Sequence, residues 1–163
     1  MSALWTEKEG RPVPFGPNLP QSTEQILRPE RAFGLEPDLP TELQLDPVPG
    51  FESVYGNTFG QGELEVLLEE HLGPEGRVLA TGWDGDRYSL LEMGDGSFGL
   101  TWVSVWDSQE ERDRFVQGFH PVLGSLASPA SLEGMEVLGR PGAILRVGVS
   151  QELSVNVREG TAR

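Results

Sequence analysis

Cysteine is absent from this chain of 163 residues, and histidine and lysine are nearly so. Without cysteine the chain has no disulfide framework and no thiol chemistry. The two histidines, His71 and His120, cannot fill a tetrahedral zinc site by themselves, because such a site usually takes four Cys, His or carboxylate ligands. Lys8 is the single lysine, and the other basic residues are scattered arginines. This bias is typical of a GC-rich, thermophilic source.

Clustered positive charge and long apolar runs are also missing. The formal net charge is -14, which disfavours nucleic acid and anionic membrane surfaces as partners, because both are bound through clustered Lys and Arg. No apolar run approaches the ~20 residues that cross a bilayer. The opening MSALWTEKEG lacks the basic-then-apolar pattern of a signal peptide. We therefore expect an acidic, cytoplasmic protein with no nucleic-acid or membrane partner.

Proline is concentrated at one end of the chain. Nine of the 13 prolines lie in residues 1–50, where they exclude long helices and central strands. Residues 22–25 resemble a capping box and predict a short helix through Leu27, and residues 41–45 alternate like an edge strand. Because apolar residues recur throughout this stretch, we expect residues 1–50 to form an extended arm packed on a single α+β domain of residues 51–163.

The stretch from Gly82 to His120 organises the domain. Residues 87–93 and 98–106 alternate with the period of β-strands, and Gly94-Asp95-Gly96 between them predicts a tight hairpin turn. Both faces of the second strand are apolar, which places it inside a sheet. Asp107 or Ser108 then caps a predicted helix that ends near His120, before Pro121. The apolar side of this helix consists of Phe115, Val116 and Phe119.

The remaining elements complete an α+β fold. Leucines at positions 64, 67, 68 and 72 share one face of a predicted helix over 63–72, which Gly73 and Pro74 end. A short helical turn is expected at 75–80, a loop at 124–131, and strands at 135–138, 143–149 and 153–157. We predict an antiparallel sheet of about four to five strands with helices 63–72 and 108–120 packed on it and the proline-rich arm outside.

Two carboxylates flanking a glycine form the most suggestive polar cluster. Asp84 and Asp86, with Asp95 expected nearby across the hairpin, are candidate ligands for a hard cation. An EF-type loop needs more oxygen ligands and a glycine at its sixth position, where this chain has Ser89. The alternative is an Asp-Gly-Asp turn whose carboxylates bond to nearby backbone amides. Three tryptophans, Trp83, Trp102 and Trp106, form either an aromatic ligand cleft or part of the core.

Catalytic motifs are not found. Glu69-Glu70-His71 resembles part of a metallopeptidase helix, but the second histidine is missing, because the positions four residues away are Leu67 and Glu75. No serine lies in a Gly-x-Ser-x-Gly elbow and no glycine-rich phosphate loop precedes a lysine. The glycine-rich stretch 55–62 is not preceded by the strand that a dinucleotide fingerprint requires. The sequence therefore assigns no catalytic residue, no metal and no cofactor.

Two blocks resemble a family. PQSTEQILRPERAF (20–33) resembles a P-x-STEQ-[IV]-L-[HR]-PE signature, and GWDGDRYSLLE with TWVSVWDSQEERDRF resembles a GWGGDRY…VWD-[ST]-x-x-[DE]-A-x-x-F pattern. Both are similar to motifs of uncharacterised bacterial proteins whose longer members carry an upstream His-Glu-x-x-His helix of zinc metallopeptidase type. This chain has no His-Glu-x-x-His, so the resemblance implies a stand-alone version of the region downstream of that helix and carries over no catalytic residue.

Two functions from different classes follow. The first is a non-enzymatic binding or protein-interaction domain that acts with a partner protein or as a homodimer. The alternative is a degenerate or carboxylate-based hydrolase that uses Asp84, Asp86 and either Glu70 or His71. Binding of Zn²⁺, Ca²⁺ or Mn²⁺, seen as a rise in melting temperature, would favour the second.

Overall fold

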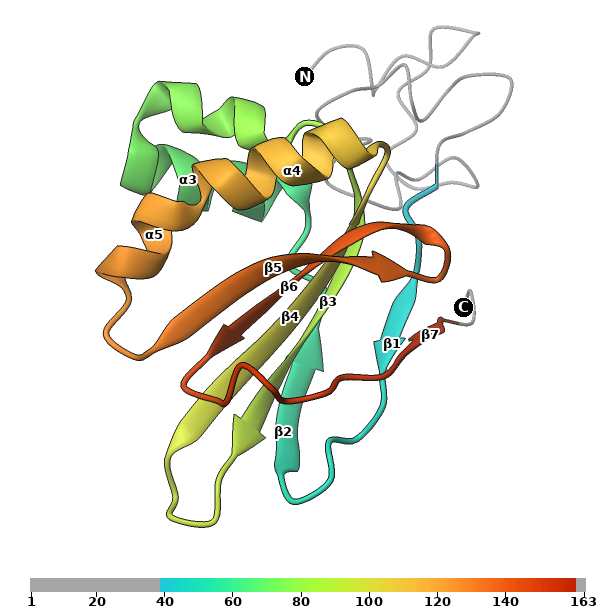
Figure 1. Ribbon diagram of the computed structural model, residues 1–163, viewed down its shortest axis with the longest axis vertical. Coiled ribbons are helices and arrows are strands. Elements are labelled where there is room, and N and C mark those ends of the chain that lie inside the picture. Colours follow the sequence, from blue (N-terminus) through green and yellow to red (C-terminus); the bar gives the residue numbers. More distant parts are fainter. Residues whose placement is uncertain (1–38, 161–163) are drawn as a thin grey trace, which may run out of the picture.

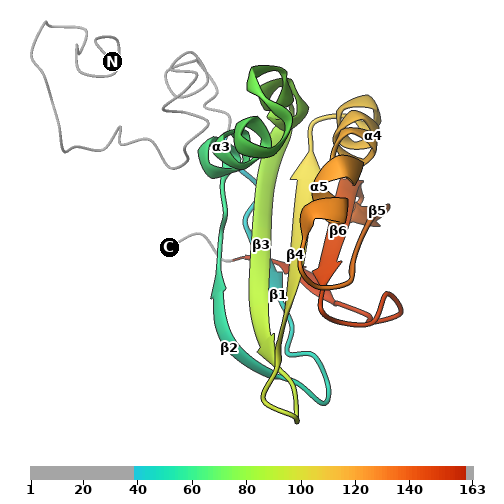
Figure 2. The same cartoon turned by 90° about the vertical axis from the view of Figure 1, so that its left-hand side faces the viewer.

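The computed structural model describes residues 39–160 and shows an α+β fold in three layers (Figures 1 and 2). The central sheet is antiparallel, with the strand order β2-β3-β4-β6-β5. Helices cover one face, and a two-stranded β1–β7 sheet lies on the other. The strands are β1 (Leu43–Leu45), β2 (Glu52–Asn57), β3 (Trp83–Glu92), β4 (Phe98–Trp106), β5 (Ala130–Val137), β6 (Arg140–Val147) and β7 (Val157–Glu159), and the helices are α3 (Gln61–Leu72), the 3₁₀ helix η2 (Pro74–Ala80), α4 (Gln109–Gly118) and α5 (His120–Ser125). The predicted fold class is confirmed.

The central hairpin forms as predicted. Strands β3 and β4 pair in the register Tyr88↔Trp102 and Leu90↔Leu100, so these side chains share the helix-covered face of the sheet. The opposite face of β4 presents Val103 and Val105, which are buried beneath β1 and β7. Both faces of β4 are therefore buried toward its Trp106 end, which explains the continuous apolar character of this strand.

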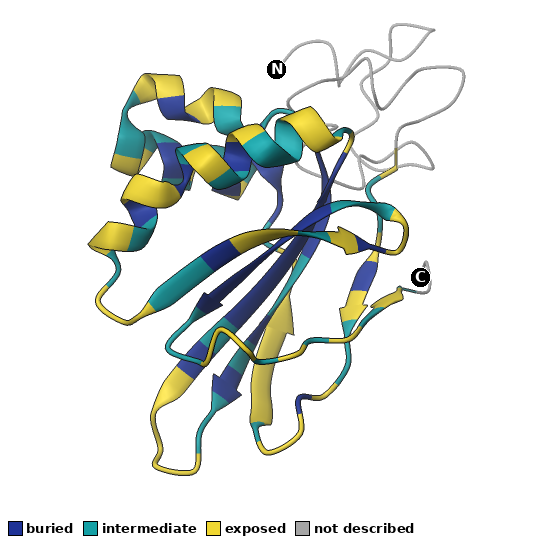
Figure 3. Ribbon diagram, in the orientation of Figure 1, coloured by how far each residue is buried: buried dark blue, intermediate teal, exposed yellow. Residues whose placement is uncertain are grey.

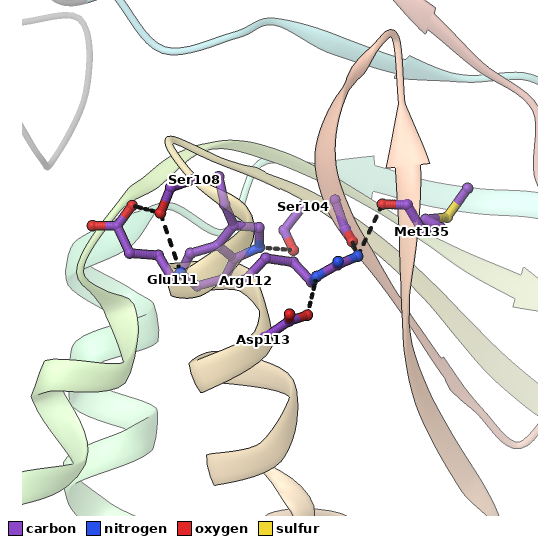
Figure 4. Close-up of polar contacts among 8 residues, drawn as sticks. Ser104, Ser108, Glu111, Arg112, Asp113 and Met135 are labelled. Carbon is purple, nitrogen blue, oxygen red and sulfur yellow. Dashed lines mark hydrogen bonds and ion pairs between the residues drawn. The ribbon is translucent and has the colours of Figure 1, made fainter.

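Helix α4 is fixed to the sheet by a cap and by aromatic packing. Of the two predicted caps, Ser108 is the one used: its Oγ accepts the backbone N–H of Glu111 at 3.2 Å and donates to the Glu111 carboxylate at 2.8 Å (Figure 4). Phe115, fully buried, stacks on Trp106 with ring centroids 4.6 Å apart and meets Trp102 edge-on at 5.7 Å. The predicted apolar side of the helix is thus the side that contacts the core.

Several predicted boundaries were wrong. Helix α4 ends at Gly118, before the expected end near His120, and Pro121 lies in the first turn of a new helix, α5, which takes up the start of the predicted loop 124–131. Strand β6 covers Arg140–Val147 instead of 143–149. Strand β5 begins at Ala130 instead of residue 135, because it pairs along the whole length of β6. The predicted strand 153–157 is largely irregular, and only Val157–Glu159 pairs, with β1.

Strand β2 was missed altogether. Residues 52–57 contain Gly56 and polar residues and have no alternating apolar pattern. All six residues of β2 are exposed, since it is an edge strand that neither layer covers (Figure 3). Its register shifts between Ser53 and Tyr55, a bulge of the kind that discourages pairing with another chain. Only the pairing with β3 defines it.

Part of the predicted arm lies outside the described residues. The helix expected over 22–27 and the packing of residues 1–38 fall in that part of the chain. The end of the arm that is described, residues 39–50, contains β1, where the edge strand was expected, and the buried side chains of Leu43 and Val48. Among residues 39–160, no helix combines the length and the apolar character needed to cross a membrane.

Candidate functional site

The carboxylate of Asp86 is buried and surrounded by N–H donors. Its Oδ1 accepts the backbone N–H of Phe59 at 2.6 Å, and its Oδ2 accepts the N–H of Gly60 at 2.9 Å and the indole N–H of Trp83 at 3.0 Å. Burial raises the pKa of Asp86, while these three donors act in the opposite direction. Asp86 therefore holds the chain that leads from β2 into α3 against the start of β3.

Asp84 is buried in a different set of contacts. Its Oδ2 accepts the hydroxyl of Thr41 at 2.6 Å and forms an ion pair with Arg140 at 2.5 Å. The backbone carbonyl of Asp84 also accepts the N–H of Thr41 at 2.5 Å. Asp84 thus connects the segment entering β1 to β3 and to the start of β6.

The three predicted cation ligands are not brought together. Asp84 and Asp86 lie at the Trp106 end of the hairpin, whereas Asp95 lies in the turn at its other end, where it accepts the N–H and the hydroxyl of Ser97. These bonds lower the pKa of the exposed Asp95. Among residues 39–160, no three His, Asp or Glu side chains cluster in a way that could hold a metal ion. Asp86 does accept backbone amides, as in the alternative interpretation, whereas the Asp84 carboxylate contacts the Thr41 hydroxyl and Arg140.

The tryptophans divide between the core and a groove. Trp83 and Trp106 are fully buried, and their indoles donate to Asp86 and to the Ser104 hydroxyl respectively. Trp102 is also buried, but its Nε1 has no hydrogen-bond acceptor among the described residues. One edge of the Trp102 ring lines an open apolar groove. Trp102 therefore borders this groove, while Trp83 lines a separate polar cavity of about 590 Å³ together with Asp86 and Arg87.

This apolar groove lies between the helices and the sheet and has a volume of about 320 Å³. Burial raises the pKa of the Tyr88 phenol, so that side chain stays uncharged at neutral pH. The helices cover only one end of this face of the sheet (Figure 2). Tyr55 of β2 and Phe98 at the start of β4 are exposed. The groove is lined by Phe59, Leu64, Leu67, Tyr88, Leu100, Trp102, Phe119 and Leu145.

A second, shallower depression adjoins the groove along α3. It shares Phe59 and Leu67 with the groove and adds Val66 of α3, whose side chain is 62 % exposed. The charged residues that line it are Glu63 and Glu70. The positions 63, 66, 67 and 70 follow the i, i+3, i+4, i+7 spacing of one helix face. We call these four residues the α3 stripe.

The leucines that were predicted to share one face of this helix divide between two environments. Leu64 and Leu68 are buried in the core, while Leu67 lies at the groove. One sequence signal for this surface was available: Val66 is an apolar residue beside Leu67 in a helix otherwise rich in glutamate. Glu70 and His71, considered as hydrolase residues, lie on the exposed end of α3, where the His71 ring contacts the backbone carbonyl of Leu67.

Comparison with known proteins gives a family but no function. No curated protein and no solved structure matches this chain. A family model described as a domain of unknown function (DUF8575) matches residues 48–160. That span contains α3, the hairpin, α4 and every residue lining the groove. The chain therefore belongs to this family of domains of unknown function, DUF8575.

Proposed function

We propose that this protein is a non-enzymatic protein-interaction domain whose apolar groove receives apolar side chains of a protein partner. The observation that carries the proposal is the open groove between α3, the α4–α5 junction at Phe119 and the sheet, which is lined by apolar side chains. Filling such a groove removes apolar surface from water, which stabilises a complex by roughly 25 cal/mol per Å². Apolar and aromatic clefts of this size are common binding sites.

The hydrolase alternative finds less support. Asp86 already accepts three N–H donors, and Asp84 is engaged by Thr41 and Arg140. A general base must be free to accept a proton from a substrate or water within hydrogen-bond distance. The contacts of both carboxylates instead stabilise the fold. These two residues therefore give the hydrolase alternative little support.

The resemblance of residues 20–119 to proteins with an upstream His-Glu-x-x-His helix bears on the kind of partner. We propose that a second polypeptide carries the His-Glu-x-x-His helix and that this chain is the non-catalytic partner of that polypeptide. A gene for such a polypeptide next to this one would support the idea. We also propose that the protein is cytoplasmic, binds no nucleic acid, and consists of one domain, residues 51–163, preceded by its arm.

Site-specific photo-crosslinking in the native host tests the interaction function. A benzophenone amino acid at Val66 reports on the groove, and the same substitution at Val78, 52 % exposed on η2, is the matched control. We expect a discrete protein adduct from position 66 and none from position 78. Equal adducts from both positions, or no adduct from position 66, would contradict the proposed function.

A further inference from the structure

We infer that the segment of the partner that enters the groove is basic and amphipathic, with Lys or Arg side chains on either side of its apolar anchors. This inference rests on the proposed function and adds to it the chemistry of the partner. It comes from the charge around the groove, not from the apolar lining. An acyl chain would need only the apolar lining, whereas a basic protein segment would also use the charge around the groove.

The α3 stripe places acidic side chains one helical turn before and after its apolar pair. Val66 and Leu67 are flanked by Glu63 on one side and Glu70 on the other. Glu70 is exposed and has no ion-pair partner among the described residues. Among residues 39–160, no Lys, Arg or His lines the groove or the adjoining depression. A partner that brings positive charge beside its apolar anchor therefore meets carboxylates at the mouth of the site.

The basic residues of the described part of the chain are already neutralised locally. Six of its seven arginines form ion pairs with Asp or Glu, and the seventh, Arg87, donates to the carbonyl of Gly56. The whole chain carries a net charge of -14. Both the local rim and the overall field thus attract a basic segment and repel an acidic one.

Three synthetic amphipathic peptides test the inference with the full-length chain. They share one leucine face and carry Lys, Gln or Glu at the polar positions. We expect the Lys peptide to bind about 10-fold more tightly than the Gln peptide at low salt, and the Glu peptide more weakly than both. The difference should largely disappear near 1 M salt, where the Debye length is about 3 Å.

Two charge-removing variants separate the rim from the overall field. Glu70→Gln should weaken Lys-peptide binding by about 2- to 5-fold. Glu136→Gln removes the same charge from exposed β5, at the far edge of the sheet, and should leave that affinity unchanged. An equal loss in both variants would mean that only net charge attracts the peptide, and would overturn the inference.

Other occupants give distinct results. Equal, salt-independent binding of the Lys and Gln peptides would overturn the basic partner. Binding of oleate at Trp102, with no binding of any peptide, would also overturn the basic partner. A dimer that is seen in sedimentation and that Leu67→Asp dissociates would do the same. If the Val66 cross-link forms and its protein adduct lacks a basic segment, the proposed function stands and this inference fails.

Discussion

Single residues near the start of β3 hold distant parts of the chain together. Asp86 bonds to backbone amides 26 and 27 positions earlier in the sequence and to the indole of Trp83. The sequence left two interpretations of Asp84 and Asp86 open, namely ligands of a cation or turn carboxylates that bond to nearby backbone amides. It could not predict which amides, because the loop before α3 reaches Asp86 only through the pairing of β2 with β3.

Replacing Asp86 with asparagine should destabilise the protein by about 2–4 kcal/mol. Whichever way the new amide turns, its NH₂ group faces an N–H donor that loses its acceptor, and a buried unsatisfied group costs roughly 1–3 kcal/mol. Urea unfolding followed by tryptophan fluorescence measures the loss. Asp95→Asn, in the exposed hairpin turn, is the control and should cost far less.

The pH dependence of stability should differ between the wild type and Asp86→Asn. Burial raises the pKa of Asp86 above its ordinary value of 3.8, so the folded state binds the proton more tightly than the unfolded state does. The stability contributed by this difference is complete below pH 3.8 and is lost as the pH rises through the raised pKa. The wild type's advantage over Asp86→Asn should therefore shrink with rising pH in urea titrations, and an advantage that grows would contradict the raised pKa.

At the scale of elements, α4 is the helix that determines how the sheet is covered. Its inner face contributes Phe115 to the aromatic cluster, and its Arg112 contacts the β5–β6 hairpin. The sequence showed the first of these contacts through the spacing of Phe115, Val116 and Phe119. It gave no sign of the second, because an arginine outside the apolar stripe of a helix is typical of the solvent-facing side.

Phe115→Ala should cost about 3–5 kcal/mol, since it leaves a cavity between Trp102 and Trp106. Thermal or urea unfolding measures this loss. Val78→Ala, on the exposed surface of η2, should stay within about 0.5 kcal/mol of the wild type. A loss below about 1 kcal/mol for Phe115→Ala would mean that the helix can repack without the ring.

Arg112→Ala should destabilise the protein by about 1–3 kcal/mol and open the β5–β6 hairpin locally. Its NH1 donates to the backbone carbonyls of Met135 and Gly142 at 3.3 and 3.2 Å (Figure 4), and both lose this donor on substitution. Hydrogen exchange of the β5 amides reports the opening. Arg114→Ala, which removes only a surface pair with Glu110, should change stability by no more than about 0.5 kcal/mol.

At the scale of the whole molecule, the segment that enters β1 comes very close to the central sheet at Gly85. Gly85 has a φ of +149°, and a Cβ there would overlap the carbonyl oxygen of Thr41. This contact lies beside the Thr41–Asp84–Arg140 bonds, so one point connects β1, β3 and β6. The resulting layer covers Val103, Val105 and Ile144.

Gly85→Ala should therefore loosen the β1–β7 layer. The methyl group must displace the backbone of Thr41, and we expect a cost of at least about 2 kcal/mol. Faster hydrogen exchange of the amides in Leu43–Leu45 would locate the effect. Gly94→Ala is the matched control, because no atom lies within 4 Å of a Cβ there. Equal effects of the two substitutions would contradict this role for Gly85.

The sequence by itself determined the elements with strong periodicity. Strand 98–106, the helix beginning after Ser108 and the helix ending at Leu72 each have a local pattern of apolar residues, a cap or a glycine stop. Such patterns arise from the geometry of one element and need no knowledge of its neighbours. They were enough for the α+β class and for placing Phe115 in the core.

Only the tertiary structure decided where β2 pairs, what Asp84 and Asp86 bond to, and that a groove exists beside Trp102. Strand β2 has no buried face to leave an alternating pattern, and its position depends on the edge that β3 offers. The groove is the space that remains between α3, Phe119 at the α4–α5 junction and the sheet. A space between elements has no residues of its own, so no pattern in a single segment could predict it.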